Sequence, residues 1–175
     1  PLSYPQPVYI IATYDEDGTP NAMNAAWGGM SDIKEISICI TATHKTTKNI
    51  LKRKAFTVSM AEAGQVVACD YVGIVSGNKM ADKFAKAGFH AIKSEFVDAP
   101  LIEELSVAVE CNLIDFNPKT GILRGGIVNV SVDERVLDEK GKVDAAKVEP
   151  IIFDPFNNDY LKVGEKVGKA FSDGK

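Results

Sequence analysis

Short apolar segments bounded by turn signals run through much of this 175-residue chain, and they limit the folds open to it. The segment PVYIIATYD (7–15) is apolar and β-branched, and the DEDG that follows it is a tight-turn signal. In EISICIT (35–41) the isoleucines alternate with other residues, which is the period of a half-buried strand. Both segments are therefore predicted to be strands.

Three later segments also favour strands. AFTVSM (55–60) is one of them, and SVAVECNLIDF (106–116) and ILRGGIVNVSVDE (122–134) are joined by NPKTG, whose Pro and Gly suit a hairpin. A total of at least five or six strands with few helices favours a closed or partly closed antiparallel barrel over a doubly wound sheet. No G-x-G-x-x-G motif follows the first strand, so a Rossmann site has no support.

Two helices are expected between these strands. KNILKRK (48–54) is predicted to be helical, with Thr46 or Thr47 as its N-cap. NKMADKFAKAGF (78–89) has the apolar spacing of an amphipathic helix, and Gly88 suits its C-cap. Residues 64–77 lie between the strand predicted at 55–60 and the helix predicted at 78–89. This apolar stretch is compatible with either a helix or a strand.

Composition narrows the class of protein. Residues 1–175 fit one domain with a sizeable core, and 45% hydrophobic with 25% charged residues is ordinary for a globular chain. A net charge of −4 argues against a general nucleic-acid binder, so no nucleic-acid partner is expected. No apolar run is long enough to cross a bilayer and the first residues do not resemble a signal peptide, so we expect a cytoplasmic protein.

The three cysteines, Cys39, Cys69 and Cys111, lie far apart in the sequence. They lack zinc-type spacing, and an odd number does not make a disulfide framework. Because all three are flanked by apolar or β-prone residues, we expect buried, reduced thiols and no metal.

The stretch TATHKTTKNILKRKAFTVSM (41–60) carries five Lys and Arg residues and no acid in an acidic chain. Strand, HKTT and helix follow one another here, and a helix N-terminus offers unpaired N–H groups and partial positive charge. Lys45, Thr46 and Thr47 therefore form a candidate site for a monophosphate. The alternative is a capped helix with a solvated basic face, and Lys52–Lys54 are expected to be such a face.

A second stretch, NAMNAAW (21–27), combines two asparagines, small side chains and the only tryptophan. Asn21 and Asn24 offer donors and acceptors, and the alanines let backbone approach a flat polar ligand. Trp27 could stack on such a ligand or close its pocket. The alternative is an irregular strand packed against the core, with Trp27 inside.

No group of side chains indicates acid–base or nucleophilic catalysis. His44 and His90 are the only histidines, and neither has an evident carboxylate partner in the sequence. Glu103 and Glu104 are adjacent, so in a helix they do not face each other. We therefore assign no catalytic side chain.

The motifs taken together resemble the flavin reductase-like proteins with an FMN-binding split barrel, above all the flavoredoxin-type branch. TYDEDGTPNAMNAAWGG and ISICITATHKTTKNI carry the likeness, and DYVGIVSGNKMADKFAKAGF, VDAPLIEELSVAVEC, VDERVLDEKGKVD and PIIFDPFNNDYLKVGEKVGKAF extend it over nearly the whole chain. The resemblance implies a mainly β fold, a six-stranded Greek-key split β-barrel with added helices. It also implies a homodimer with non-covalent FMN at or near the subunit interface.

The resemblance also implies roles for particular residues. Those expected along the isoalloxazine ring are Asn21, Ala22, Met23, Asn24, Ala26 and Trp27. Those expected at the ribityl chain are Thr41 and Thr43, and those at the phosphate are Lys45, Thr46, Thr47 and Asn49. Ser76, Gly77 and Lys83 would approach the flavin or phosphate, with Asp82 as an alternative ion-pair partner for Lys83. Phe153 would cover the flavin, in its own site or in the partner's.

Two departures bear on the electron donor. Relatives often carry a polar residue, commonly His, before the strand that here begins Ile122–Leu123, with Arg124 as the nearest polar group. Asn78 stands where Arg is common in relatives.

Taken as a whole, the sequence predicts an FMN flavoprotein, a flavin reductase or flavoredoxin-type oxidoreductase that moves electrons from NAD(P)H or a protein donor to an acceptor. The alternatives are a non-catalytic flavin- or haem-binding protein and a β-barrel interaction module without a cofactor.

Overall fold

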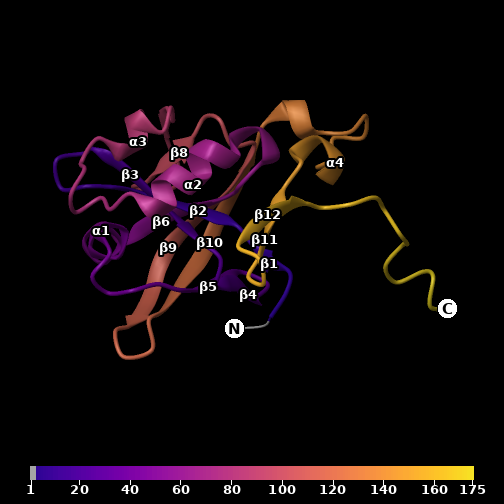
Figure 1. Ribbon diagram of the computed structural model, residues 1–175, viewed down its shortest axis with the longest axis horizontal. Coiled ribbons are helices and arrows are strands. Elements are labelled where there is room, and N and C mark those ends of the chain that lie inside the picture. Colours follow the sequence, from indigo (N-terminus) through magenta and orange to yellow (C-terminus); the bar gives the residue numbers. More distant parts are fainter. Residues whose placement is uncertain (1–2) are drawn as a thin grey trace.

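A curled, seven-stranded antiparallel sheet forms the centre of the computed structural model, which describes residues 3–175 (Figure 1). Its strands, in spatial order, are β3 (Pro20–Ala25), β2 (Tyr9–Tyr14), β6 (Ala55–Met60), β9 (Val107–Asn117), β10 (Ile122–Val132), β5 (Glu35–Cys39) and β4 (Gly28–Asp32). All the strands predicted from the sequence are present, and the hairpin at NPKTG joins β9 to β10.

The sheet is bent so far that its two edges meet. Strands β3 and β4 are its opposite edges, yet only Ala26 and Trp27 separate them in the chain. Since consecutive Cα atoms are about 3.8 Å apart, so short a link forces the two edges together. The edges are not hydrogen-bonded to each other, so the barrel is split between β3 and β4. The split-barrel fold class is confirmed, with seven strands where six were expected, because the stretch 20–32 forms two strands.

The alternation of side chains explains why this sheet has a filled interior. In β5, Ile36 and Ile38 are buried, and they pack inside the curl against Phe56 of β6 and Leu123 of β10. In β2, Ile11 joins that interior cluster. The apolar run of β2 is continuous because helices also cover the other face of this strand.

Among the α-helices of residues 3–175, three lie close to the sheet. They are α1 (Lys45–Arg53), α2 (Val66–Ile74) and α3 (Lys83–Lys86), with α4 (Ala145–Val148) further along the chain (Figure 1). Helices α2 and α3 contribute to a second apolar cluster that contains Ile10 of β2, Val72 of α2 and Phe84 of α3. The short 3-10 turns are η1 (Ala63–Gln65) and η2 (Glu134–Val136).

Two helix predictions need correction. Helix α1 begins at Lys45, with His44 as an extended N-cap residue that makes no side-chain cap bond, so the predicted threonine caps are wrong. The predicted helix at 78–89 is also wrong, since only Lys83–Lys86 is helical. Phe84 and Phe89 instead pack edge to face, 5.7 Å between ring centroids, which bends this segment over the core. Burial of the two rings thus outweighs the helical propensity of the segment.

Two small sheets complete the structure. One contains β1 (Gln6–Pro7), β11 (Ile151–Asp154) and β12 (Asp159–Lys162), and the other contains β7 (Ala91–Lys93) and β8 (Pro100–Ile102). After β12, residues 163–175 extend away from the body of the molecule (Figure 1). Within residues 3–175, no helix is both long and apolar enough to cross a membrane.

The cysteines are free thiols, but they are not all buried as expected. Cys69 and Cys111 are buried, whereas Cys39 is exposed. Strand alternation gives the reason, because Ile38 and Ile40 turn inward and the residue between them must turn outward.

Gly125 of β10 lies close against the ring of Phe56, and this close approach can be tested. A Cβ at Gly125 would lie under 3.0 Å from two ring atoms of the fully buried Phe56. We expect Gly125→Ala to lower the free energy of unfolding by about 1–3 kcal/mol, because the core has no room to accept the methyl group. Urea denaturation measures the change.

The neighbouring glycine supplies the matched control. A Cβ at Gly126 would meet Ile114 at an ordinary contact distance of 3.5 Å. Gly126→Ala should therefore change the free energy of unfolding by no more than about 0.5 kcal/mol. Equal losses in both variants would contradict the close packing at Gly125.

Candidate functional site

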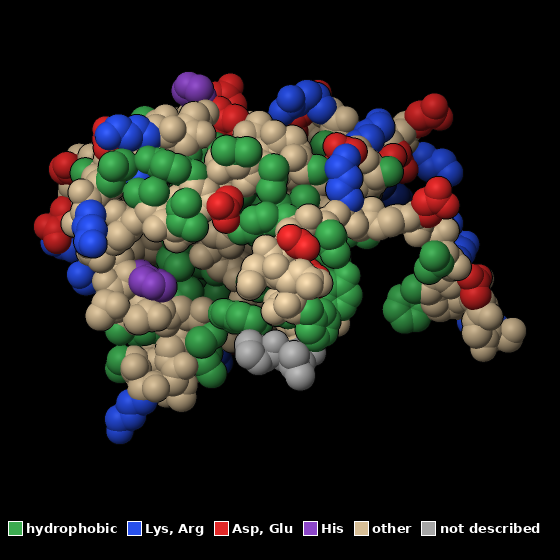
Figure 2. Space-filling model, in the orientation of Figure 1, with side chains coloured by type: hydrophobic (Ala, Val, Ile, Leu, Met, Phe, Trp, Pro, Cys, Tyr) green, Lys and Arg blue, Asp and Glu red, His purple; other side chains and the backbone are tan. Residues whose placement is uncertain are grey.

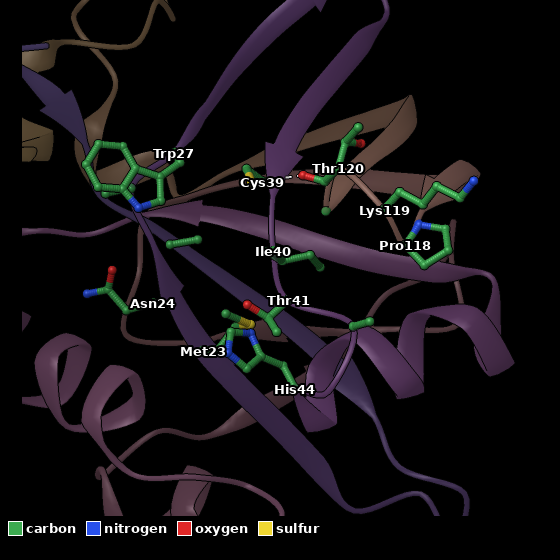
Figure 3. A pocket seen from close by; sticks show the side chains of 14 residues that line it. Met23, Asn24, Trp27, Cys39, Ile40, Thr41, His44, Pro118, Lys119 and Thr120 are labelled. Atoms are coloured by element: carbon green, nitrogen blue, oxygen red, sulfur yellow. Dashed lines mark hydrogen bonds between the residues drawn. The ribbon is translucent and has the colours of Figure 1, made fainter. Parts of the chain in front are cut away.

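A pocket of about 510 Å³ lies where the two edges of the sheet meet. Here it is called the split pocket, and its lining residues are Met23–Trp27, Cys39–Ala42, His44 and Pro118–Gly121. Figure 3 shows Trp27 and Asn24 on one side of it, the Pro118–Thr120 hairpin on the other, and Met23 beside His44. The curl of the sheet therefore brings three separate segments of the chain to one cavity.

A second pocket of about 280 Å³, the helix pocket, lies between the start of α1 and the end of α2. Its lining residues are Met23, Asn24, His44–Thr46, Val72–Gly77 and Lys83. Met23, Asn24 and His44 line both pockets. The two pockets therefore adjoin, and one elongated ligand could occupy both.

Two glycines let the wall of the helix pocket lie close to β3. A Cβ at Gly73 would lie 2.8 Å from the Cβ of Asn24, and a Cβ at Gly77 would lie 2.5 Å from Oδ1 of Asn21. Any larger residue at these positions would push the end of α2 or the following loop away from the strand. The lack of a side chain at Gly73 and Gly77 thus sets the shape of the helix pocket.

The N-terminal turn of α1 faces the helix pocket through Lys45 and Thr46. The first N–H groups of a helix have no partner within the helix, so this end carries partial positive charge. The Thr46 hydroxyl accepts a hydrogen bond from Nδ2 of Asn21 at 2.7 Å, which joins the helix to β3. An anion at this position would meet backbone donors, a hydroxyl and the Lys45 ammonium.

Lys45 already has an acidic partner in this structure. Its Nζ lies 2.6 Å from Oδ2 of Asp15, in the turn between β2 and β3, and both side chains are partly exposed. The hydrogen bond from Lys45 is the main reason that the pKa of Asp15 lies below its ordinary value. A bound anion would therefore share the Lys45 charge with Asp15.

Lys83 is the buried cation of the helix pocket. Its side chain is 3% exposed, and Nζ donates to the backbone oxygens of Val72 and Val75 at 2.9 Å each. Both carbonyls are at the end of α2, where backbone oxygens lack helical partners. An ammonium has three hydrogens, so one N–H is left for a ligand in the pocket.

The charge of Lys83 has no acidic neighbour. Within residues 3–175, no carboxylate lies within ion-pair distance of it, and Asp82, the alternative partner named from the sequence, pairs with Lys86 at 3.2 Å. Burial lowers the pKa of Lys83 to about 8. A buried ammonium held only by neutral carbonyls favours a ligand that brings negative charge.

Asn24 connects both pockets to the C-terminal part of the chain. Its Nδ2 donates to the Cys69 oxygen at 3.2 Å and to the Tyr160 hydroxyl at 3.3 Å. Tyr160, on β12, donates in turn to Oδ1 of Asp70 at 2.9 Å. Burial and then this bond to Asp70 raise the pKa of Tyr160 to about 12. The network fixes the position of the Asn24 amide at the junction of the pockets.

The structure brings ten of the sixteen candidate cofactor-binding residues to the two pockets. These are Met23, Asn24, Ala26, Trp27, Thr41, Lys45, Thr46, Ser76, Gly77 and Lys83. The six that line neither pocket are Asn21, Ala22, Thr43, Thr47, Asn49 and Phe153.

Most of those six have a clear structural position. Thr47 donates to the Thr41 oxygen at 2.8 Å, and Asn49 donates to the Thr13 hydroxyl at 3.1 Å, so both fix the base of α1. Ala22 is in the core, and Phe153 packs against a tyrosine of β12, 6.1 Å between ring centroids. Their part in binding a cofactor stays a prediction.

Some lining residues were not predicted. Cys39 and Ile40 at the end of β5 and the hairpin 118–121 line the split pocket. His44 lines both pockets, and burial and then the charge of Lys83 hold its pKa below the ordinary value. The hairpin is nearly a hundred positions from Met23 in sequence, and no local pattern could have placed it there.

Two polar groups have partners that the sequence did not reveal. His90 lies with Nδ1 2.5 Å from Oε1 of Glu104, which contradicts the expectation that neither histidine has a carboxylate partner. Arg53 pairs with Asp98 at 3.1 Å and donates to the Asp15 oxygen, so it is not a purely solvated basic residue. Both contacts lie outside the two pockets.

Residues 2–153 match the family described as flavin reductase like domain. This match covers most of the sequence, so the chain belongs to the flavin reductase-like family. The resemblance seen in the sequence motifs is thereby confirmed.

Two solved flavoredoxins share the whole fold. The structure of flavoredoxin from Desulfovibrio vulgaris (Miyazaki F) is 40% identical, with a TM-score of 0.94, over 99% of this chain and 95% of that one. Flavoredoxin from Methanosarcina acetivorans is 26% identical, with a TM-score of 0.89, over 98% of this chain and 92% of that one. The family and these neighbours support a flavin-binding redox function.

A more distant solved structure agrees in fold. An FMN-binding domain of a flavin reductases-like enzyme from Shewanella baltica OS155 has a TM-score of 0.83 at 18% identity, over 94% of this chain and 89% of that one. An uncharacterized protein from Aeropyrum pernix is 27% identical over 108 residues, which is 61% of this chain. The aligned part is 41% of that curated relative's length.

The low pKa of Lys83 gives stability a particular pH dependence. Between about pH 8 and 10.5 the folded chain has released the Lys83 proton that the unfolded chain still holds, so the free energy of unfolding rises with pH over this window. Lys83→Met lacks this rise. We expect its free energy of unfolding, relative to the unchanged chain, to fall steadily as pH increases from 8 to 10, as measured by urea denaturation.

Lys86→Met is the matched control, because Lys86 lies on the same short helix with about half of its side chain exposed. Its free energy of unfolding relative to the unchanged chain should not change in the same way over this pH range. A flat difference for Lys83→Met would show that the lysine is not desolvated in the folded chain.

Proposed function

We propose that this chain is an FMN-binding flavoprotein of the flavin reductase or flavoredoxin type, which takes electrons from NAD(P)H or a protein donor and passes them to an acceptor. The observation that carries the proposal is the pair of adjoining pockets. The helix pocket offers positive groups for an anion at the start of α1 and at Lys83. The split pocket lies along the small residues that precede Trp27 in the chain. A ligand with a flat ring at one end and a phosphate at the other fits both.

The dimensions agree with such a ligand. The split pocket of about 510 Å³ is within the roughly 300–1,000 Å³ common for cofactor sites, and the helix pocket adds about 280 Å³. The phosphate would lie against Lys45 and Thr46, with Ser76 and Gly77 opposite. The isoalloxazine ring would lie along Met23, Asn24 and Ala26, with Trp27 at its edge and Thr41 beside the ribityl chain.

Bound FMN would supply the electron-transfer chemistry, and the protein would supply placement and charge. Lys83 would favour negative charge on a ligand, because its ammonium is buried and lacks a carboxylate. Asn24 would orient the polar atoms of the isoalloxazine ring, because its amide is held in place by hydrogen bonds that run through Tyr160 to Asp70. Trp27 is about half exposed and would shield one part of the ring from water.

The names printed for the neighbours support the same function. They include two flavoredoxins, an FMN-binding flavin reductase-like domain and component B of nitrilotriacetate monooxygenase from Bacillus cereus. We extend to this chain the binding of FMN and transfer of electrons. We also propose that it works in the cytoplasm as a homodimer, with FMN near the subunit interface. The resemblance to the flavin reductase-like proteins is the ground for the dimer.

Loss of the Lys45 charge should weaken FMN binding. A hydrogen bond to a charged group contributes about 1.5–3 kcal/mol, so Lys45→Ala should raise the Kd for FMN about 10- to 100-fold. Quenching of flavin fluorescence during titration measures the Kd.

The matched control is Lys48→Ala, one turn further along the same helix. Lys48 lines neither pocket and donates to Oδ1 of Asn78 at 3.2 Å. Its replacement should leave the Kd within about twofold, since a distant surface charge is screened by salt. If both variants bind FMN equally well, the phosphate does not lie at Lys45.

The visible absorbance spectrum of the FMN-loaded protein tests the redox proposal itself. We expect a flavin spectrum that bleaches without oxygen when NADH or NADPH is added, and the more effective nucleotide identifies the donor. Bleaching only by dithionite would favour a protein donor or a non-catalytic flavin-binding role. A protein that binds no added FMN would overturn the proposed function.

A further inference from the structure

The amide of Asn24 lies at the junction of the two pockets with both of its donor hydrogens already in use. Its Nδ2 carries two hydrogens, which go to the Cys69 oxygen at 3.2 Å and to the Tyr160 hydroxyl at 3.3 Å. A backbone carbonyl can only accept, so a flipped amide would set two oxygens against each other at Cys69. Asn24 therefore has only its oxygen left for a ligand.

The oxygen of this amide is free to accept a hydrogen bond. No group among residues 3–175 donates to Oδ1 of Asn24, and this atom is not fully buried, so a ligand can reach it. Figure 3 shows the oxygen directed toward the Trp27 side of the split pocket and the nitrogen turned away from the other labelled side chains. Figure 2 shows the surface hollowed between α1 and the β11–β12 hairpin, from which Tyr160 comes. A ligand in the pockets thus meets at Asn24 an acceptor and no donor.

Tyr160 holds this amide from β12, 136 positions further along the chain. Its hydroxyl donates to Oδ1 of Asp70 at 2.9 Å, so a lone pair of the same oxygen is left for the Asn24 amide. Burial and then the bond to Asp70 raise the pKa of Tyr160 to about 12, so near neutral pH the hydroxyl keeps the proton that it donates. The two acceptors of the Asn24 amide, one on α2 and one on β12, therefore fix it in one orientation.

The isoalloxazine ring of oxidised FMN has several acceptors along its polar edge but only one N–H, at N3. An amide that could turn would serve either kind of atom, whereas a fixed acceptor selects the N–H. We propose that Asn24 recognises the flavin ring by accepting a hydrogen bond from N3–H, and that Tyr160 is a positioning residue that keeps the Asn24 oxygen available to it. The inference rests on the proposed FMN-binding function and names the ring atom that this site reads.

Binding of N3-methyl-FMN, which lacks this N–H, tests the acceptor. Loss of one hydrogen bond should make its Kd about fivefold higher than that of FMN in the unchanged chain. Asn24→Leu keeps the size and branching of the side chain but removes the acceptor, so the ratio of the two Kd values should fall to within about twofold of one. Quenching of flavin fluorescence measures both constants.

Tyr160→Phe tests the positioning role. Without the hydroxyl, one hydrogen of the Asn24 amide loses its acceptor, so the ratio should fall about twofold or more from its value in the unchanged chain. Tyr71→Phe is the matched control, because Tyr71 is also half-buried, donates to Sδ of Met80 at 3.2 Å and lines neither pocket. Its ratio should equal that of the unchanged chain.

Hydrogen exchange of the Asn24 side-chain amide, followed by NMR without flavin, measures the positioning separately from binding. Its hydrogens should exchange with water about tenfold more slowly than those of the exposed Asn112, and Tyr160→Phe should remove much of this difference. Fast exchange at Asn24, or an unchanged ratio in Asn24→Leu or Tyr160→Phe while FMN still binds, would overturn this inference and leave the proposed function standing. A chain that binds neither flavin would overturn both.

Discussion

The two-residue connection Ala26–Trp27 is the constraint on which the rest of the structure depends. It joins the opposite edges of a seven-stranded sheet, and so short a span can exist only if the sheet curls until those edges meet. The backbone N–H of Cys39 donates to the backbone oxygen of Trp27 at 2.7 Å and holds this two-residue connection against the end of β5. A Cβ at Gly28 would lie 2.9 Å from the Ser37 oxygen, so glycine permits this close approach. The split pocket exists because the edges meet without pairing.

The helix pocket depends on a different compromise, a buried charge held only by backbone carbonyls. Lys83 stabilises the end of α2 through two carbonyls, but desolvation of its ammonium costs free energy that no carboxylate offsets. A residue that served only packing would be apolar. Local cost of this kind is common where a protein is arranged for a ligand, and here it accompanies the helix N-terminus at Lys45. The proposed FMN site would use both positive groups at one end.

Sequence reasoning found the strands more reliably than the helices. The alternation in 35–41 and the hairpin at NPKTG are local signals, and both are confirmed. The helix predicted at 78–89 failed because burial of Phe84 and Phe89 is decided by the distant strands and helices that receive them. Helix α2 has no clear amphipathic pattern, since it is apolar on more than one side, and the sequence left it undecided.

By itself, the sequence determined the mainly β class, the family motifs and ten of the residues that line the two pockets. These follow from local periodicity, turn chemistry and residue type, which a linear pattern records. Only the tertiary structure decided that Thr47 and Asn49 support α1, that Lys45 pairs with Asp15, and that the 118–121 hairpin reaches the split pocket. Those contacts join residues far apart in the chain, and the curl of the sheet, which no local pattern specifies, brings them together.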